Sequence, residues 1–221
     1  MSTEFENQNP QVEQTEETGL TFVEPKIVPQ VATLWNNTRL FNQTYKMANI
    51  ICQSELVPQN YRGKPADVLI AIDIGNRIGI SPIIVMQQSL IVKGNFTWKG
   101  GACKSMVDGC GKYKNTHYEM VGERGTDSWG YYLRAEEKNG RIVDGVTVTI
   151  AMAKSEGWYN QNPKWRNVPE LMLKYRCSSY FMRTECPGVG MGFLTAEEME
   201  DIEYNTTMGG AELSKKLDEE N

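Results

Sequence analysis

The chain has 221 residues, which suits one domain with extensions or two small domains. Hydrophobic residues make up 40% of it, enough for a sizeable core, and no run of about 18 apolar residues predicts a membrane span. The N-terminal residues lack the basic and apolar regions of a signal peptide. The five cysteines are an odd number at low density, so we expect reduced thiols in a cytoplasmic protein.

The net charge of −5 conceals an uneven distribution along the chain. Residues 1–24 carry six acidic and no basic side chains, and residues 185–221 carry ten acidic and two basic ones. Residues 25–184 carry 21 basic and 12 acidic side chains. A basic body suits a polyanionic partner. The acidic ends either only increase solubility, as in many soluble proteins, or compete for the basic surface, or recruit a basic partner.

These shifts in composition divide the chain into three parts. Residues 1–30 are polar and acidic and are predicted to be a disordered tail. Residues 31–202 are expected to form the folded core. Residues 203–221 are predicted to be a second acidic tail.

The first part of the core reads as helices followed by a hairpin. Apolar periodicity, prolines at helix starts and glycines at helix ends predict helices over Val31–Ser54, Pro65–Arg77, Pro82–Ser89 and Ala102–Asp108. Gly79 is expected to close the second helix and Ser81 to cap the third. Leu90–Val92 and Phe96–Trp98 are predicted strands joined by a turn over Lys93–Asn95, after which Gly100 and Gly101 are expected to break the chain.

A β-pattern follows. Three strand-like runs cover 114–122, 128–137 and 141–153, and Asn139-Gly140 is a strong hairpin signal between the last two. Helices, then an antiparallel β-meander, then a helix packed on it indicate an α+β fold.

The stretch from Met152 to Glu198 contains an aromatic and basic loop, then a helix. The helix is predicted over Pro169–Glu185, and its apolar residues spread around most of its circumference, so it should be largely buried. Arg176 and Arg183 lie seven residues apart on one stripe. Either they pair with carboxylates elsewhere in the fold, or they form a row of anion contacts. Beyond them, Thr195 and Glu198 are spaced as a capping box.

Several chemistries find little support in the sequence. The chain has no phosphate-binding P-loop, which argues against an ATP-driven mechanism. The single histidine, His117, is six or more residues from Cys103 and Cys110, wider than the short ligand spacing of structural zinc sites, so we expect it to pack or to make one hydrogen bond. Asp67 and Asp73 fall on roughly opposite sides of one predicted helix, a poor arrangement for a metal-dependent nuclease.

Basic residues alternate with aromatic residues and glycines in the core. Binders of single-stranded nucleic acid combine a positive groove with rings on which bases stack. The basic candidates for DNA contact are Lys104, Lys112, Lys154, Lys164 and Arg166, and the aromatic candidates are Trp158, Tyr159 and Trp165. The aromatic rings fit core or subunit-interface packing equally well.

Two segments resemble a known family. "LVPQNYRGKPADVLIAIDIGNRIGISP" followed by "VKGNFTWKG" resembles the front half of the RecT family of phage single-strand annealing proteins. "VPELMLKYRCSSYFMRTECPGVGMGFLTAEEME" is similar to the back half of that family. The resemblance covers residues 40–200, and the matching positions in the second segment are Pro169, Met172, Leu173, Arg176, Phe181, Arg183, Pro187, Gly192, Glu197 and Glu198.

The resemblance implies an ATP-independent protein that binds single-stranded DNA and anneals complementary strands in phage homologous recombination and DNA repair. It implies rings or helical filaments of identical subunits, a phage exonuclease partner, a host single-strand-binding protein as a further partner, and a bacterial cytoplasm. The implied fold is an α+β core whose meander packs on a long helix beside a positive groove that continues across subunits. Arg176, Arg183, Lys164, Arg166 and Lys174 would contact phosphates. No catalytic residue, metal or cofactor is implied, and a dependence of annealing on Mg²⁺ stays open.

Three other functions remain to be distinguished from annealing. The first is passive binding of single-stranded DNA, which would share the groove but not accelerate annealing. The second is a metal-dependent nuclease, and the third is a purely structural phage protein.

Overall fold

The computed structural model describes residues 33–202 and residue 206. The acidic tails predicted over 1–30 and 203–221 therefore lie, apart from residue 206, outside the described residues. The described chain combines helices with two antiparallel sheets, which confirms the α+β class. Among these residues, no single helix is long and apolar enough to cross a membrane; two successive helices, bent by 110°, meet the length and composition only together.

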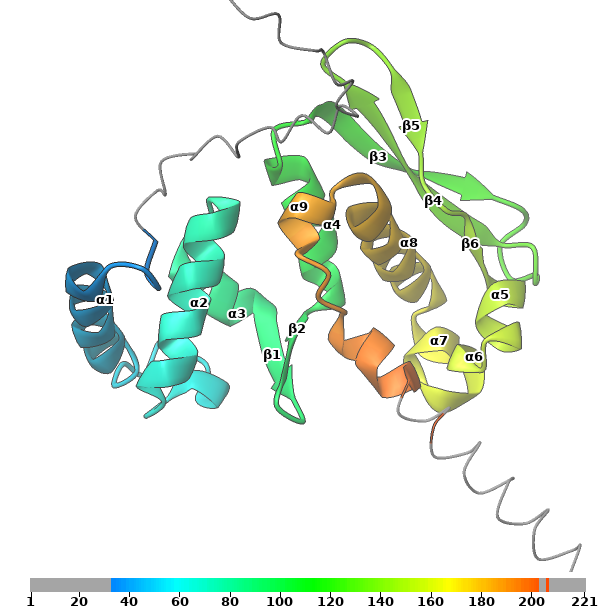
Figure 1. The fold of residues 1–221 in the computed structure, drawn as a ribbon. Coiled ribbons are helices and arrows are strands. Elements are labelled where there is room, and N and C mark those ends of the chain that lie inside the picture. The colour runs from blue at the N-terminus through cyan, green and yellow to red at the C-terminus, as the bar shows by residue number, and fades with distance from the viewer. Residues whose placement is uncertain (1–32, 203–205, 207–221) are drawn as a thin grey trace, which may run out of the picture.

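The N-terminal part is helical (Figure 1). It contains α1 (Thr38–Ile51), a 3₁₀ turn η1 (Gln59–Tyr61), α2 (Pro65–Ile78) and α3 (Pro82–Gln88). The first helix begins later than predicted because Asn37 is extended and its side chain accepts a hydrogen bond from the Leu40 N–H, as an N-cap does. Gly79 ends α2 with φ of 71°, as expected for a left-handed C-terminal glycine.

A short hairpin joins this part to the rest. Strands β1 (Ser89–Val92) and β2 (Asn95–Trp98) pair in antiparallel register, so the predicted hairpin is confirmed. The turn has two residues rather than three: Lys93 and Gly94 both have positive φ, 48° and 80°. Two central residues with positive φ match the twist of paired strands, and this shortens the loop.

Helix α4 (Gly100–Gly109) starts where a break was predicted. That prediction was wrong because Gly100 and Gly101 are needed for close packing rather than for a turn. A Cβ atom on Gly100 would lie 3.2 Å from the Tyr175 ring and 3.1 Å from a Glu197 carboxylate oxygen. The glycines therefore let the first turn of α4 approach the segments that carry Tyr175 and Glu197.

The second sheet contains β3 (Tyr113–Val121), β4 (Gly130–Glu137), β5 (Ile142–Asp144) and β6 (Val148–Thr149). β3, β4 and β5 form a meander, and β6 also pairs with β4. The single strand predicted over 141–153 is wrong: it divides at Gly145 and then becomes helix α5 (Ile150–Ser155). A Cβ on Gly145 would lie 2.7 Å from the Phe181 ring, so the chain here is held against a helix rather than extended.

The aromatic and basic segment is helical, not a loop as predicted. It contains α5 and two single-turn helices, α6 (Trp158–Gln161) and α7 (Lys164–Asn167). Then follow α8 (Pro169–Glu185), with the predicted bounds, α9 (Pro187–Gly190) and a helix over 196–202. Each single-turn helix places one tryptophan in the core, Trp158 from α6 and Trp165 from α7.

Helix α8 is the centre of the C-terminal half. In Figure 1 it lies between α4 and the second sheet, and it contacts both. Its Phe181 and Met182 join the larger hydrophobic core, whereas Leu173 and Cys177 belong to a second core beneath α5, α6 and α7. The predicted buried helix packed on the meander is confirmed.

Candidate nucleic-acid interface

Arg176 is buried within α8, with 6% of its surface exposed. Its guanidinium donates a short hydrogen bond to Asp201 and lies 3.8 Å from the Glu198 carboxylate. The Trp158 ring covers it, with the guanidinium carbon 4.0 Å from the ring centroid. Arg176 is thus enclosed by carboxylates on one side and by a ring on the other.

Arg183 is held by the same acidic segment. Its guanidinium donates to Glu198 Oε1 at 2.9 Å, and the Ser179 hydroxyl donates to the same oxygen at 2.6 Å. The other Glu198 oxygen accepts from the Thr195 N–H at 2.9 Å, and Thr195 Oγ1 accepts from the Glu198 N–H, so the predicted capping box is confirmed. One carboxylate therefore both starts the 196–202 helix and fixes it to α8.

The arginine stripe is therefore an internal ion-pair network, the alternative that the sequence left open. The prediction that Arg176 lies on the wall of an open groove is wrong, because the 196–202 helix covers it. Arg183 keeps 30% of its side chain exposed, although its charge is paired. Burial raises the pKa of Asp201 even though Arg176 acts to lower it.

Trp158 and Trp165 lie in the core, which favours core packing over base stacking for these two rings. Only 4% and 1% of their surfaces are exposed, and the two rings lie 5.7 Å apart in a stacked arrangement. The Tyr180 ring packs against Trp158 at 6.5 Å. The predicted base-stacking role is therefore wrong for these two tryptophans. Tyr159 is half-buried, and the Lys154 Nζ lies 5.3 Å from the centroid of its ring.

Several of the predicted phosphate contacts are paired with nearby carboxylates. Lys104 donates to Asp108 at 2.7 Å, and Lys154 donates to Asp127 at 2.5 Å. Lys174 donates to Glu170 at 2.7 Å and lies 4.8 Å from the centroid of the Tyr131 ring.

Lys112 has weaker partners. It donates to the Glu185 backbone carbonyl at 3.1 Å and lies 3.7 Å from a Glu137 oxygen. Exposed pairs such as these are worth about 1 kcal/mol or less, so a phosphate can compete with the carboxylate for the cation.

Two predicted cations, both in α7, have no acidic partner among the described residues. Lys164 and Arg166 are exposed, and Arg166 donates to the Tyr159 backbone carbonyl at 2.8 Å. Arg62, which sequence reasoning missed, is similar: it is exposed and donates to the Val57 and Glu55 carbonyls at 2.8 and 2.5 Å. A carbonyl partner orients a guanidinium without neutralising its charge. The sequence signal was present, since Arg62 and Lys64 flank Gly63 in the first RecT-like segment.

In Figure 1, α7 and the tip of the β1–β2 hairpin both lie toward the lower edge of the molecule, with the 196–202 helix between them. Lys99, which follows β2, is half-buried and donates to the Gln87 carbonyl at 2.7 Å. Among the predicted DNA contacts in the described residues, Lys164 and Arg166 are the two cations without an acidic partner, so α7 is the predicted contact region best suited to an anionic ligand.

Two further features of the described residues concern histidine and metal chemistry. His117 Nε2 lies 3.1 Å from Glu119, the single hydrogen bond that was expected. No three His, Cys, Asp or Glu side chains of the described residues gather as a metal site would require.

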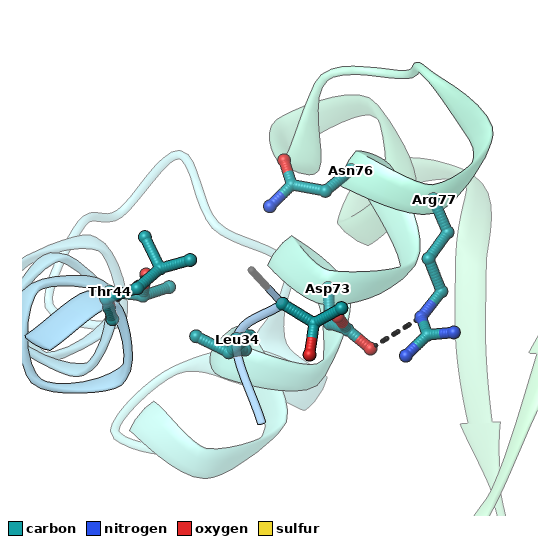
Figure 2. Close-up of a pocket in the computed structure, with 7 residues that line it drawn as sticks. Leu34, Thr44, Asp73, Asn76 and Arg77 are labelled. Atoms are coloured by element: carbon teal, nitrogen blue, oxygen red, sulfur yellow. Dashed lines mark hydrogen bonds and ion pairs between the residues drawn. The ribbon is translucent and has the colours of Figure 1, made fainter. Parts of the chain in front are cut away.

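A cavity of about 240 Å³ between α1 and α2 (Figure 2) is lined by Leu34, Thr44, Asp73, Asn76 and Arg77, with Asp73 paired to Arg77 at 2.8 Å. It contains none of the predicted DNA contacts.

Comparison with known protein families, curated proteins and solved structures finds no match for this chain.

Proposed function

We propose that this protein binds single-stranded DNA and anneals complementary strands without a nucleotide cofactor, as a homo-oligomer. The observation that carries the proposal is the exposed cation set of the folded body, above all Lys164, Arg166 and Arg62, whose charges no described carboxylate neutralises. The RecT-like segments support the same function, because they include Arg62 and all of α8. The phage exonuclease and the host single-strand-binding protein are partners proposed on that resemblance alone.

The proposed mechanism is electrostatic. Two DNA strands repel one another through their phosphates, and cations on one strand release its counterions and reduce that repulsion. Held along its backbone, the strand leaves its base edges free to test a second strand for pairing. No covalent step is needed, and weak contacts in each subunit become strong when subunits are linked along one strand.

The buried tryptophans change how the strand would be held. Because Trp158 and Trp165 lie inside the core, backbone contacts rather than ring stacking would supply most of the affinity. Binding should then depend steeply on salt and little on base sequence.

A single assay separates annealing from its rivals. Complementary oligonucleotides, one with a fluorophore and one with a quencher, are mixed with and without the protein, and the rate of quenching is measured. We expect faster quenching with protein and no ATP. Binding without acceleration indicates a passive binder, Mg²⁺-dependent shortening of the labelled strand indicates a nuclease, and no gel shift at low salt rules out a DNA-binding role.

A further inference from the structure

Two cysteines far apart in the sequence meet where two helices end. Cys110 follows the last residue of α4, and Cys186 follows the last residue of α8. Their sulfur atoms lie 3.9 Å apart, in direct contact. Because α4 and α8 pack along each other, this contact joins the ends of the central helix pair.

The two sulfur atoms are close enough to form a disulfide after a small movement. A covalent S–S bond is about 2.05 Å long, so the sulfurs need to approach by about 2 Å, which rotation about the side-chain bonds can supply. Other cysteines of the chain have different partners. The Cys52 thiol donates to the Asn49 carbonyl and the Cys177 thiol donates to the Lys174 carbonyl, each inside its own helix or at its end.

The two sulfurs differ in how an oxidant reaches them. Cys110 is partly exposed, whereas Cys186 is buried. Burial, and next the nearby Cys110, raises the pKa of the Cys186 thiol to about 12. An oxidant from solution therefore reacts first at Cys110, and Cys186 is placed to complete the reaction.

We propose that Cys110 and Cys186 form a reversible disulfide that fastens the end of α4 to the end of α8 under oxidising conditions. With a low-molecular-weight disulfide such as oxidised glutathione, the Cys110 thiolate attacks one sulfur and one glutathione thiolate leaves. Cys186 then loses its proton and attacks the Cys110 sulfur, and the second glutathione leaves. The two protein thiols give up two electrons and two protons, and oxidised glutathione becomes two molecules of glutathione.

The bond would stabilise the folded chain because it closes a long loop in the unfolded state. From the loop length between residues 110 and 186, the oxidised protein should melt roughly 5–15 °C higher than the reduced protein. The site lies beside Lys112, whose side chain donates to the Glu185 carbonyl. The proposal stands on the thiol geometry alone and does not depend on DNA binding.

The test uses the full chain, reduced and then freed of reductant. It is incubated with oxidised glutathione at about pH 8, where more thiolate is present, and digested without reduction for mass spectrometry. We expect the number of free thiols to fall from five to three and a peptide pair linked through Cys110 and Cys186 to appear. Retention of all five thiols, a different pairing, or a link between two chains overturns the proposal.

Variants identify the order of the steps. Cys186→Ser should accumulate glutathione on Cys110 and form no internal link, while Cys110→Ser should form neither product and show no rise in melting temperature. Cys52→Ser removes a thiol outside the pair and should still form the link. If a variant does not fold, the wild-type peptide map still decides the question.

Discussion

The guanidinium of Arg176 lies on the Trp158 ring, 4.0 Å from its centroid, while its nitrogen atoms face Asp201 and Glu198. This contact joins α8, the single-turn helix α6 and the 196–202 helix. A buried cation between a ring and two carboxylates holds these segments together, so we expect the main role of Arg176 to be structural.

Replacing Arg176 with alanine should destabilise the fold strongly. The change leaves Asp201 buried without its cation, which typically costs about 3–5 kcal/mol, whereas Glu198 keeps its bond to Arg183. Urea unfolding followed by circular dichroism measures the free energy of unfolding. The exposed Arg166→Ala variant is the matched control and should change that free energy by less than about 0.5 kcal/mol. Equal stability of Arg176→Ala and wild type would contradict the network described here.

Removing both cations of α7 should instead affect DNA binding. Lys164 and Arg166 have no described acidic partner, so Lys164→Ala with Arg166→Ala should leave the free energy of unfolding nearly unchanged. If each contacts one phosphate of a single strand, the slope of log affinity against log salt should fall by about 1.4. Fluorescence anisotropy of labelled single-stranded DNA at several salt concentrations measures the slope.

The control for that experiment is Lys138→Ala, an exposed cation in the turn between β4 and β5. It removes the same kind of charge at a different place. Because the control removes one charge and the α7 variant removes two, the losses are compared per charge; equal losses per charge would mean that net charge, rather than the α7 surface, determines affinity.

Gly145→Ala should destabilise the junction between the sheet and α8. The new Cβ would lie 2.7 Å from the Phe181 ring and 3.2 Å from the Leu133 carbonyl, so packed groups must move, at a cost of about 1–3 kcal/mol. Gly109→Ala, at the end of α4, is the control, because its Cβ would meet nothing within 4 Å. Thermal melting of both variants tests this. A Gly145→Ala melting temperature equal to that of Gly109→Ala would show that the close approach is absent.

Glu170 should make stability depend on pH in the acid range. Hydrogen bonds from Lys174 first and Tyr131 second lower its pKa from the ordinary 4.5. A lowered folded-state pKa favours the ionised form, so the stabilisation is present above pH 4.5 and is lost as pH falls through the lowered value. Because Glu170 is about one-third exposed, its contribution should be about 1 kcal/mol or less.

The measurement compares wild type with Glu170→Gln in urea at pH 7, 5 and 4. We expect wild type to be more stable at pH 7 and 5, and the difference to narrow by pH 4. A difference that stays constant across these pH values would assign the effect of the substitution to packing rather than to charge.

Local sequence was sufficient for elements whose signals lie within a few residues. Pro169 and Pro187 bracket α8, Asn139-Gly140 marks the β4–β5 turn, and Thr195 with Glu198 forms the capping box. Each signal acts through backbone geometry or hydrogen bonds across at most four residues. For the same reason, the order of helices, meander and long helix was enough to predict the α+β class.

Long-range packing decided the rest. Gly100 and Gly101 were predicted to break the chain, but they form the start of α4. Tyr175 and Glu197 lie so close to Gly100 that a side chain there would contact them. A predicted single strand is divided at Gly145, where Phe181 of α8 occupies the adjacent space, and it continues as β6 and then α5.

The sequence by itself determined that two arginines share one stripe of a buried helix, since helical spacing alone places Arg176 and Arg183 there. Only the tertiary structure decided what they face. Their partners, Glu198 and Asp201, come from a helix that begins after α8 has ended and the chain has turned back across it. Charge composition cannot reveal that return, because the sign of a side chain does not specify which opposite charge the fold brings to it.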